Sequence, residues 1–258
     1  MTATLVELDG VTIAYRDSAA GTDTATGAGP LGEVPVLLVH GMGGDGHTWD
    51  RFAHALIREG RRVIVVDLRG HGRSAHTPTY LFDEFAHDVL RLCDDLAMTR
   101  VDLVGHSLGG YAVTVSAQQR PDLVRRVVIE ETPLPRRPGD PVPNLSGRLP
   151  TLPELWHAGT SLIRHPRAVL AFDRSMTKSA LEQFRTPNPA WWEALPQITA
   201  TMLVVHGGAG GMVDPERVAD AAALIGDCTV VRFRSGHSIH RDHYREFADV
   251  VLPFLMHP

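Results

Sequence analysis

Apolar and polar residues follow two alternating patterns along the chain, and together these patterns predict a sheet of mostly parallel strands covered by helices. Short, almost continuous apolar runs are typical of strands that are buried on both faces. Such runs occupy residues 34–41, 61–70, 100–107, 124–131, 201–207 and 228–235. Apolar residues recur with helical spacing at residues 47–60, 81–98, 108–120, 215–226 and 241–255. Strands that alternate with helices favour right-handed crossovers, so the sequence predicts an α/β fold with helices on both faces of the sheet.

The segment 133–196 breaks this alternation. It begins with the proline-rich sequence PLPRRPGDPVPN and continues through short helical pieces that carry several aromatic residues. Open α/β sheets bind ligands at the carboxyl edge of their strands, so we expect this segment to be a lid inserted over that edge rather than an ordinary helical layer. The core domain would then comprise residues 1–132 and 197–258. Of the lid aromatics, Trp156, Trp191 and Trp192 are candidates for contact with an apolar substrate, with packing between lid and core as the alternative.

The composition narrows the class of partner. The 258 residues carry a formal net charge of −5, whereas a nucleic-acid-binding protein usually shows a basic face and a high isoelectric point. The first residues, MTATLVELDG, lack the basic segment and apolar core of a signal peptide. No apolar run approaches the roughly 20 residues that a membrane span requires. We therefore expect a soluble cytoplasmic protein whose partner is a small molecule, without nucleic acid or membrane.

Residues 105–109, GHSLG, match the pattern G-x-S-x-G of a nucleophile elbow. A serine on a very tight turn between a strand and a helix has strained backbone angles, and its neighbours must be small enough for the chains to pass. The turn exposes the hydroxyl at the positive end of the following helix. A predicted buried strand precedes the motif and a predicted helix follows it, which favours a nucleophilic Ser107 over a structural Gly–Ser turn.

With this motif in place, the chain resembles the α/β-hydrolase superfamily over nearly its whole length. The resemblance rests on HGMGG at residues 40–44, DLRGHGRS at 67–74, GHSLGG at 105–110 and SGHSIH at 235–240. It implies that Ser107 is the nucleophile and that His237 is the general base that takes the serine proton. It also implies an oxyanion hole made by the backbone N–H groups of Met42 and Leu108. This chemistry requires no cofactor.

Other histidines in these motifs have structural explanations. His40 and His71 match turn histidines of the family, for which the resemblance implies loop hydrogen bonds. His237, His240 and His243 are spaced by three residues, which would place neighbours on a related face of a helix and could suggest a metal site. No cluster of cysteine or carboxylate residues completes a closed site, so no metal is expected. We instead expect His240 and His243 to lie at the start of the last helix and at the surface.

The acid that should complete a Ser–His pair is missing from its usual place. A third group is needed to fix the histidine tautomer and to stabilise the imidazolium. In most of the superfamily this acid follows the strand predicted at residues 201–207, but Gly210 occupies that position here. Asp214 lies four residues later and directly before Pro215, which is the position of a helix N-cap and explains the aspartate without catalysis.

Some branches of the family, certain haloalkane dehalogenases among them, carry the acid after the preceding strand. In this chain that strand ends in Glu130 and Glu131, two acids after a run of buried valines, where a charge is costly. Successive side chains of a strand point to opposite faces, so we expect only one of the two to reach His237. The alignment with that branch favours Glu131 as the acid, with Glu130 and then Asp214 as alternatives.

These residues favour a cofactor-free serine hydrolase that cleaves a small, largely apolar carboxylic ester or lactone through an acyl-enzyme intermediate. The resemblance excludes haloalkane dehalogenases and epoxide hydrolases, because these need an aspartate in the place of Ser107. Hydrolysis of carbon–carbon bonds, and perhydrolysis as in cofactor-free haloperoxidases, use the same triad and stay open as alternatives. A third hypothesis is a non-catalytic ligand-binding protein of this fold, which only the replacement at Gly210 supports.

Overall fold

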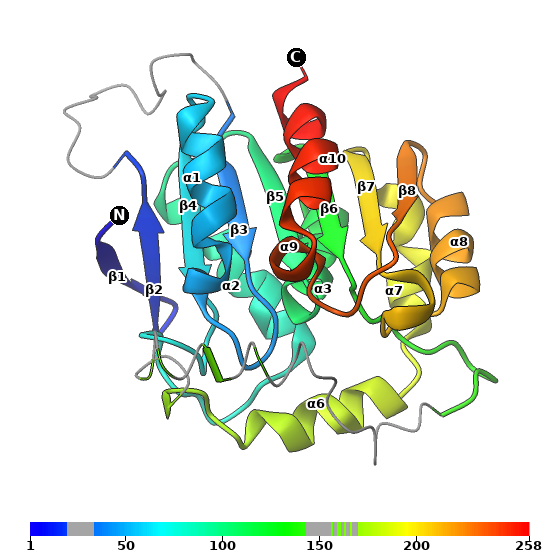
Figure 1. Cartoon of the computed structure of the whole chain (residues 1–258). Helices are drawn as coiled ribbons and strands as arrows, with labels where there is room; N and C mark the ends of the chain where they lie inside the picture. The colour runs from blue at the N-terminus through cyan, green and yellow to red at the C-terminus, as the bar shows by residue number, and fades with distance from the viewer. Residues whose placement is uncertain are drawn as a thin grey trace.

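The computed structural model describes residues 1–19, 34–142 and 170–257, together with residues 156, 159, 160, 163 and 166. Among them, an eight-stranded sheet in the order β1-β2-β4-β3-β5-β6-β7-β8 forms the centre (Figure 1). Its strands are β1 (Ala3–Leu8), β2 (Val11–Asp17), β3 (Val36–Val39), β4 (Val63–Asp67), β5 (Val101–His106), β6 (Val124–Glu130), β7 (Thr201–His206) and β8 (Cys228–Arg232). β2 is antiparallel to β1 and β4, and all other neighbours are parallel. The predicted α/β fold with a mostly parallel sheet is confirmed.

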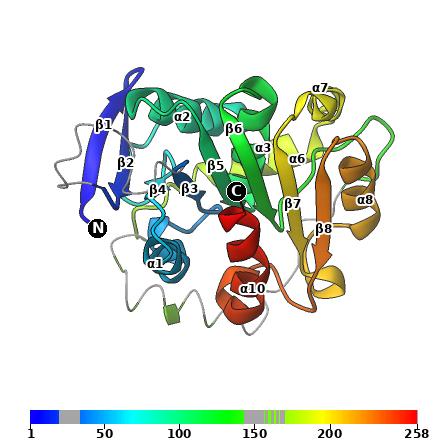
Figure 2. The same cartoon turned by 90° about the horizontal axis from the view of Figure 1, so that it is seen from above.

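Helices cover both faces of this sheet, as the apolar spacing predicted. The described helices are α1 (Asp50–Arg58), α2 (Phe82–Asp95), α3 (Leu108–Gln119), α6 (Met176–Arg185), α7 (Pro189–Glu193), α8 (Pro215–Ala223), α9 (Ile239–Asp242) and α10 (Tyr244–Met256), with 3-10 turns η1 (Gly46–Trp49), η2 (Leu195–Gln197) and η3 (Gly208–Gly210). Figure 2 shows α1 and α10 on one face and α2 and α3 on the other. In the described ranges, no helix has the length and apolar character that crossing a membrane would require.

Successive residues of the central strands point into two separate apolar cores. In β6, Val128 packs in the core beneath α1 and α10, whereas Ile129 packs in the core beneath α2 and α3. Glu130, the last residue of β6, lies on the side of Val128, with its carboxylate next to His240. Glu131 follows the strand with a φ of 46°, and its carboxylate reaches the loop after β7. The fold therefore gives the two adjacent acids different surroundings, as the strand geometry predicted.

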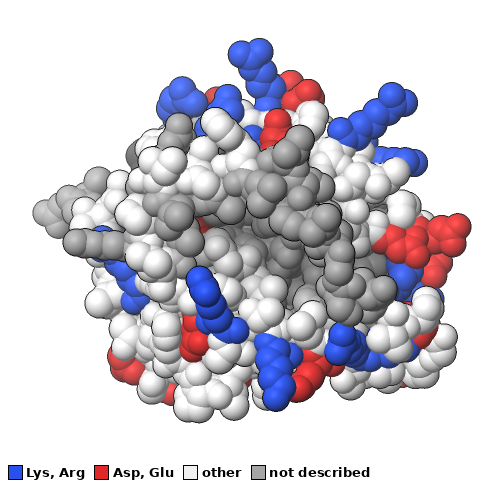
Figure 3. All heavy atoms as spheres, turned by 60° about the horizontal axis from the view of Figure 1, so that its bottom comes forward, with Lys and Arg blue, Asp and Glu red and all other residues white. Residues whose placement is uncertain are grey.

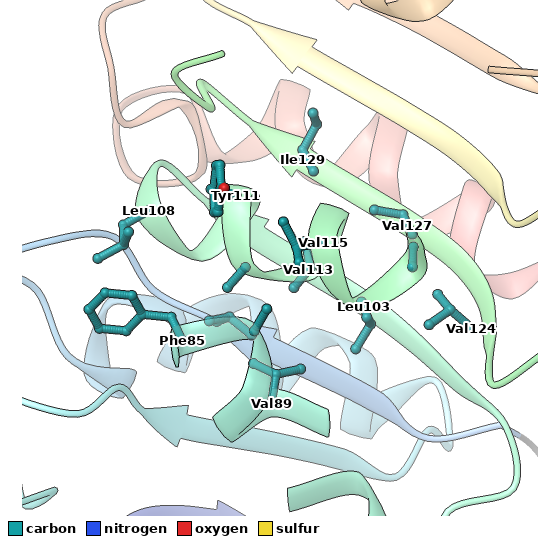
Figure 4. Packing of buried hydrophobic residues seen from close by; sticks show 14 of the residues in the cluster. Phe85, Val89, Leu103, Leu108, Tyr111, Val113, Val115, Val124, Val127 and Ile129 are labelled. Atoms are coloured by element: carbon teal, nitrogen blue, oxygen red, sulfur yellow. The ribbon is translucent and has the colours of Figure 1, made fainter. Parts of the chain in front are cut away.

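The core beneath α2 and α3 supports the strands that carry the elbow and the two acids. Figure 4 shows Phe85 and Val89 of α2, Val113 of α3 and Leu103 of β5 packed together, all in one buried cluster. Burial of each such side chain contributes about 1.5–3 kcal/mol relative to exposure. This packing fixes α3 on the sheet, and Ser107 immediately precedes that helix.

Helix α6 lies across the carboxyl ends of the parallel strands, at the bottom of Figure 1. Hydrogen bonds join it to the loop before α2 and to the start of that helix. Ser179 Oγ and Gln183 Nε2 donate to the carbonyl of Tyr80 at 3.0 and 2.8 Å, and Gln183 Oε1 accepts from the Phe82 amide at 2.7 Å. Within the predicted lid at residues 133–196, most of the stretch from residue 143 to residue 169 lies outside the described residues. Figure 3 shows the face that includes this end of the molecule, with charged side chains both at its margin and across its lower half.

Candidate active site

Ser107 lies in the tight turn between β5 and α3, with φ 52° and ψ −116°. Few residues other than glycine adopt a positive φ, and holding one there costs about 1–3 kcal/mol. The flanking glycines are required by the packing. A Cβ atom on Gly105 would lie 2.4 Å from the carbonyl oxygen of Gly109, and one on Gly109 would lie 2.4 Å from that of Val39. The residues of the motif therefore form the strained turn that their pattern predicted.

The loop after β3 lies directly against this serine. A Cβ atom on Gly41 would come within 3.0 Å of the Ser107 Cβ, so only a glycine allows the two turns to approach so closely. Met42 follows Gly41 in this loop, and Leu108 is the first residue of α3. The backbone N–H of a first helical residue has no carbonyl partner within the helix, which leaves the Leu108 N–H available for a ligand.

Two histidines hold the loop after β3 in position. His40 Nε2 accepts from the Leu68 amide at 3.0 Å, and its Nδ1 donates to the Gly41 carbonyl at 2.8 Å. His71 Nε2 accepts from the Gly43 amide at 3.1 Å. Burial, with a smaller contribution from His40, lowers the pKa of His71 to about 3, so its ring stays neutral and keeps its acceptor nitrogen. The predicted role of both histidines in loop hydrogen bonding is confirmed.

Glu131 follows β6 and is almost fully buried, with 1% of its surface exposed and a φ of 46°. Its Oε1 accepts from the Gly207 amide and its Oε2 from the Met212 amide, both at 2.6 Å. Two hydrogen bonds from backbone amides replace part of the hydration that a buried carboxylate loses. The Glu131 carboxylate is therefore held in one orientation by the loop after β7.

This carboxylate faces His237, which lies in the loop before α9. Glu131 Oε2 is 3.5 Å from Nδ1 of His237, which is within ion-pair distance. The geometry does not amount to a hydrogen bond, because Nδ1 has no hydrogen-bond partner among the described residues. The histidine also lies beside the elbow, since its backbone carbonyl accepts from Nε2 of His106 at 2.7 Å and the two rings are 4.7 Å apart. His106 is the residue directly before Ser107.

The glycines after β7 explain why no acid stands in the usual position. A Cβ atom on Gly210 would lie 2.4 Å from the carbonyl oxygen of Ser235, so any side chain there would require the loop to move. A Cβ atom on Gly211 would lie 2.3 Å from Oε1 of Glu131. The Glu131 carboxylate thus occupies space that the loop after β7 leaves open by carrying glycines.

Asp214 has a different role. It is exposed and is the N-cap of α8, where its Oδ1 accepts from the Glu216 amide at 3.0 Å and Pro215 is the first helical residue. The predicted capping role is confirmed. In the part of the chain that the structure describes, the carboxylate within ion-pair distance of His237 belongs to Glu131 and not to Asp214.

Glu130 points to the other face of β6, and its partner is His240. Oε1 accepts from the backbone N–H of His240 at 2.9 Å, and Oε2 is 2.7 Å from Nδ1 of the same residue. Both side chains are buried, and the His240 ring stacks on Trp49 at 4.1 Å. The prediction that His240 lies at the surface was therefore wrong. The sequence did contain a signal, because the second of two adjacent buried acids also needs a partner.

Glu130, His240 and His106 bring their potential metal-ligand atoms within 4.8 Å of one another. Both oxygens of Glu130 are already engaged by His240. The Nε2 atom of His106 donates to the carbonyl of His237. Glu130 and His240 are thus joined directly by hydrogen bonds, whereas His106 binds the backbone of His237 and contacts the His240 ring at 5.1 Å.

The three tryptophans that are candidates for substrate contact have different surroundings, and Trp191 lines a cavity together with Glu131. Trp191 and Trp192 are buried in the core, where Trp191 stacks with Tyr111 at 6.4 Å and Trp192 Nε1 donates to the Pro135 carbonyl at 2.9 Å. Trp156 is 71% exposed. Trp191 and Trp192 therefore pack between helix α7 and the core, as the stated alternative has it, and contact of any of the three with a substrate stays a prediction.

The chain is similar to known proteins in sequence and in structure. The sequence model of the alpha/beta hydrolase fold matches residues 34–197. The sn-1-specific diacylglycerol lipase ABHD11 of Mus musculus is 26% identical over 85% of this chain and 80% of that protein, and its counterpart in Danio rerio is 31% identical over 43% of this chain and 38% of that protein. The crystal structure of the enol-lactonase from Burkholderia xenovorans matches with a TM-score of 0.78 at 22% identity, covering 98% of this chain and all of that one.

The structural match shows the fold, and the sequence model covers more than half of the chain. The chain belongs to the alpha/beta hydrolase fold family.

Proposed function

We propose that this protein is a serine hydrolase that cleaves a small, largely apolar carboxylic ester or lactone, with Ser107, His237 and Glu131 as its catalytic triad. The observation that carries the proposal is the Glu131 carboxylate, which is buried, oriented by two backbone amides and 3.5 Å from Nδ1 of His237. Catalytic hydrogen bonds are often long in a free enzyme and shorten when substrate binds. A small movement of Glu131 and His237 toward each other would form the hydrogen bond that completes the triad.

In the first half of the reaction, Oγ of Ser107 attacks the carbonyl carbon of the ester while Nε2 of His237 takes the serine proton. Glu131 stabilises the imidazolium that forms and keeps the neutral ring in the tautomer with its proton on Nδ1. The negative charge on the substrate oxygen is met by the N–H groups of Met42 and Leu108, at the positive end of α3. The imidazolium then protonates the leaving alcohol oxygen, and the acyl-enzyme remains on Ser107.

In the second half, His237 takes a proton from a water molecule, and the resulting hydroxide attacks the acyl carbon. The same two amides stabilise the second tetrahedral intermediate. Collapse of that intermediate returns the proton to Ser107 Oγ and releases the carboxylic acid. With a lactone, the alcohol and the acid are released as one molecule, because the leaving oxygen stays tethered to the acyl group.

The substrate class draws support from the names of the relatives. A diacylglycerol lipase and an enol-lactonase, as these proteins are named, both act on acyl–oxygen bonds. We assign the segment 133–196 the role of a lid, which the position of α6 across the carboxyl ends of the strands supports.

Turnover of short aryl esters and of simple lactones tests the proposal. We expect hydrolysis that follows saturation kinetics in the parent and is lost in Ser107→Ala. Product analysis with a diketone, and with acetate plus hydrogen peroxide, separates ester hydrolysis from carbon–carbon cleavage and perhydrolysis. A Ser107→Ala variant that is as active as the parent on aryl esters would contradict a serine mechanism.

A further inference from the structure

The network around Glu130 connects the elbow to the segment that carries His237. The backbone carbonyl of Glu130 accepts from the amide of Ser107 at 2.9 Å. Its side chain reaches the other way, to the backbone N–H and Nδ1 of His240 at 2.9 and 2.7 Å. One residue at the end of β6 therefore contacts both the turn with the proposed nucleophile and the helix that begins just after the proposed base.

The segment from His237 to His240 is held at both ends by buried side chains. At its start, the carbonyl of His237 accepts from His106 Nε2 at 2.7 Å. At its end, His240 is bound by Glu130 and stacks on Trp49, with ring centroids 4.1 Å apart and an interplanar angle of 25°. A carbonyl oxygen can only accept, so the proton of the neutral His106 ring must be on Nε2.

We propose that Glu130, His240 and His106 are positioning residues, which hold the segment from His237 to His240 so that Nδ1 of His237 faces Glu131. The inference rests on the proposed function, because it assigns His237 the role of base. None of the three would touch the substrate. They would affect the reaction only by fixing the position of the His237 imidazole ring.

The free-energy cost of burying the Glu130 carboxylate favours a positioning role for this network over a role in core packing alone. Glu130 is fully buried, and burial of a carboxylate is unfavourable unless hydrogen bonds replace its hydration. An apolar residue would fill the same space beneath Trp49 without this cost. What an apolar residue cannot do is accept two hydrogen bonds from His240 and so fix the orientation of the chain there. Displacement of a catalytic group by about 1 Å can reduce a rate about a hundredfold.

The charge of the network changes within the pH range of an ordinary assay. Burial raises the pKa of Glu130 to about 7, against the opposing effects of His106, His237 and the backbone amides of Ile239 and His240. Burial also lowers the pKa of His106 to about 3, so that ring stays neutral. Protonation of Glu130 would remove one acceptor from the hydrogen-bond pair with His240. We expect the pH profile of kcat to include an ionisation near neutrality that Glu130→Gln removes or shifts.

The test compares Glu130→Gln, His240→Ala and His240→Asn with a matched control, Asp102→Asn. The side-chain amide introduced by His240→Asn would retain an N–H near the place of Nδ1, which makes that variant a rescue of the alanine variant. Asp102 is equally buried in the neighbouring strand, but lies at the opposite end of the sheet and binds Arg61 and Arg125. Each protein is assayed for kcat and KM on an aryl ester, for labelling rate by a fluorophosphonate, and for hydrogen exchange at residues 236–243.

We expect kcat and labelling rate to fall about 10–100-fold in Glu130→Gln and His240→Ala, with KM nearly unchanged and faster exchange at residues 236–243. His240→Asn should recover part of the loss. Asp102→Asn should lose thermal stability but keep its rates and its exchange in that segment. Unchanged rates in a folded Glu130→Gln, or losses no larger than those of Asp102→Asn, would overturn the proposal.

The exchange measurement separates this inference from the proposed function. If the parent were not labelled by the fluorophosphonate and hydrolysed no ester, the proposed function would fail. Faster exchange at residues 236–243 in the variants would still support the proposal that Glu130 and His240 hold this segment in place. Unchanged exchange would overturn that proposal. His240→Asn is the mildest of the substitutions and keeps the experiment decisive if Glu130→Gln does not fold.

Discussion

The two ends of the parallel sheet both contain fully buried carboxylates, but they surround them with different partners. At the amino end, Asp102 binds the guanidinium groups of Arg61 and Arg125, both at 2.6 Å. At the carboxyl end, Glu130 and Glu131 face histidines. Arginine keeps its charge at any ordinary pH, whereas histidine gains and loses a proton near neutrality. The Asp102–arginine pairs at the amino end thus have fixed charges and contribute to stability, whereas the glutamate–histidine pairs at the carboxyl end can exchange protons.

The backbone differs between the two ends in a way that agrees with this division. Ser107 and Glu131 follow the neighbouring strands β5 and β6 at the carboxyl end, and both have a positive φ. Such conformations persist only where the surrounding structure enforces them, and they are enriched at functional sites. Asp102, in contrast, lies inside β5 and is not among the described residues with a positive φ. We therefore expect large effects on rate from changes at one end and large effects on stability from changes at the other.

The largest effect on rate is expected for Ser107→Ala. Removal of the nucleophile should lower kcat/KM for an aryl ester by at least about 10⁴-fold, because only the oxyanion hole and substrate binding remain. Thermal unfolding should be close to that of the parent, since the alanine keeps the same backbone strain. Substantial activity in this variant would mean that the nucleophile is another residue, and would contradict the assignment of the reaction to the carboxyl end of the sheet.

A smaller loss is expected for Gly211→Ala, which tests the space that the loop after β7 leaves for Glu131. The new methyl group would lie 2.3 Å from Glu131 Oε1, so the carboxylate must move away from its present position. We expect kcat to fall about 10–100-fold with a smaller change in KM. Gly226→Ala is the matched control, because a Cβ atom there would meet nothing within 4 Å. Equal rates for the two variants would show that the orientation of Glu131 is unimportant.

For Asp102→Asn we expect the opposite balance of effects. Loss of one partner leaves two arginines next to a buried neutral side chain, which costs about 3–5 kcal/mol of unfolding free energy. Chemical denaturation would measure this loss. Assayed well below its melting temperature, the variant should keep the kcat of the parent. A clear fall in kcat without loss of stability would mean that the amino end of the sheet takes part in the reaction.

The smallest effect is expected for Asp214→Ala. Loss of an N-cap aspartate costs about 1 kcal/mol, because the Glu216 amide at the start of α8 loses its acceptor. The midpoint of denaturation should shift accordingly, and ester hydrolysis should not change. A strong loss of activity in this variant would return Asp214 to the candidate acids.

Much of the fold followed from the sequence because buried strands and amphipathic helices leave different apolar patterns. The placement of Glu131 on the side of His237 followed from strand alternation together with the resemblance to a family branch, and its catalytic role stays a prediction. The sequence showed that Gly210 is not an acid. It could not show that the Ser235 carbonyl and the Glu131 carboxylate fill the space around Gly210 and Gly211, because those contacts join distant segments.

His240 and the tryptophans illustrate what local patterns cannot predict. The stacking of His240 on Trp49 joins residues that are far apart in the sequence, and no periodicity reports such a contact. Trp191 and Trp192 lie in a segment whose composition fits either a lid over a substrate or packing on the core. Their burial against Tyr111 and Pro135 depends on how α7 docks, which the apolar pattern of five residues does not determine.

The central claim is that Glu131, after β6, activates the serine in place of an acid after β7. The most direct test is the rate of labelling by a fluorophosphonate, followed by intact mass, in the parent, Ser107→Ala, Glu131→Gln and Asp214→Asn. We predict rapid single labelling of the parent and of Asp214→Asn, none in Ser107→Ala, and labelling slowed by about 10³-fold or more in Glu131→Gln. Normal labelling of Glu131→Gln together with slow labelling of Asp214→Asn, or no labelling of the folded parent, would contradict it.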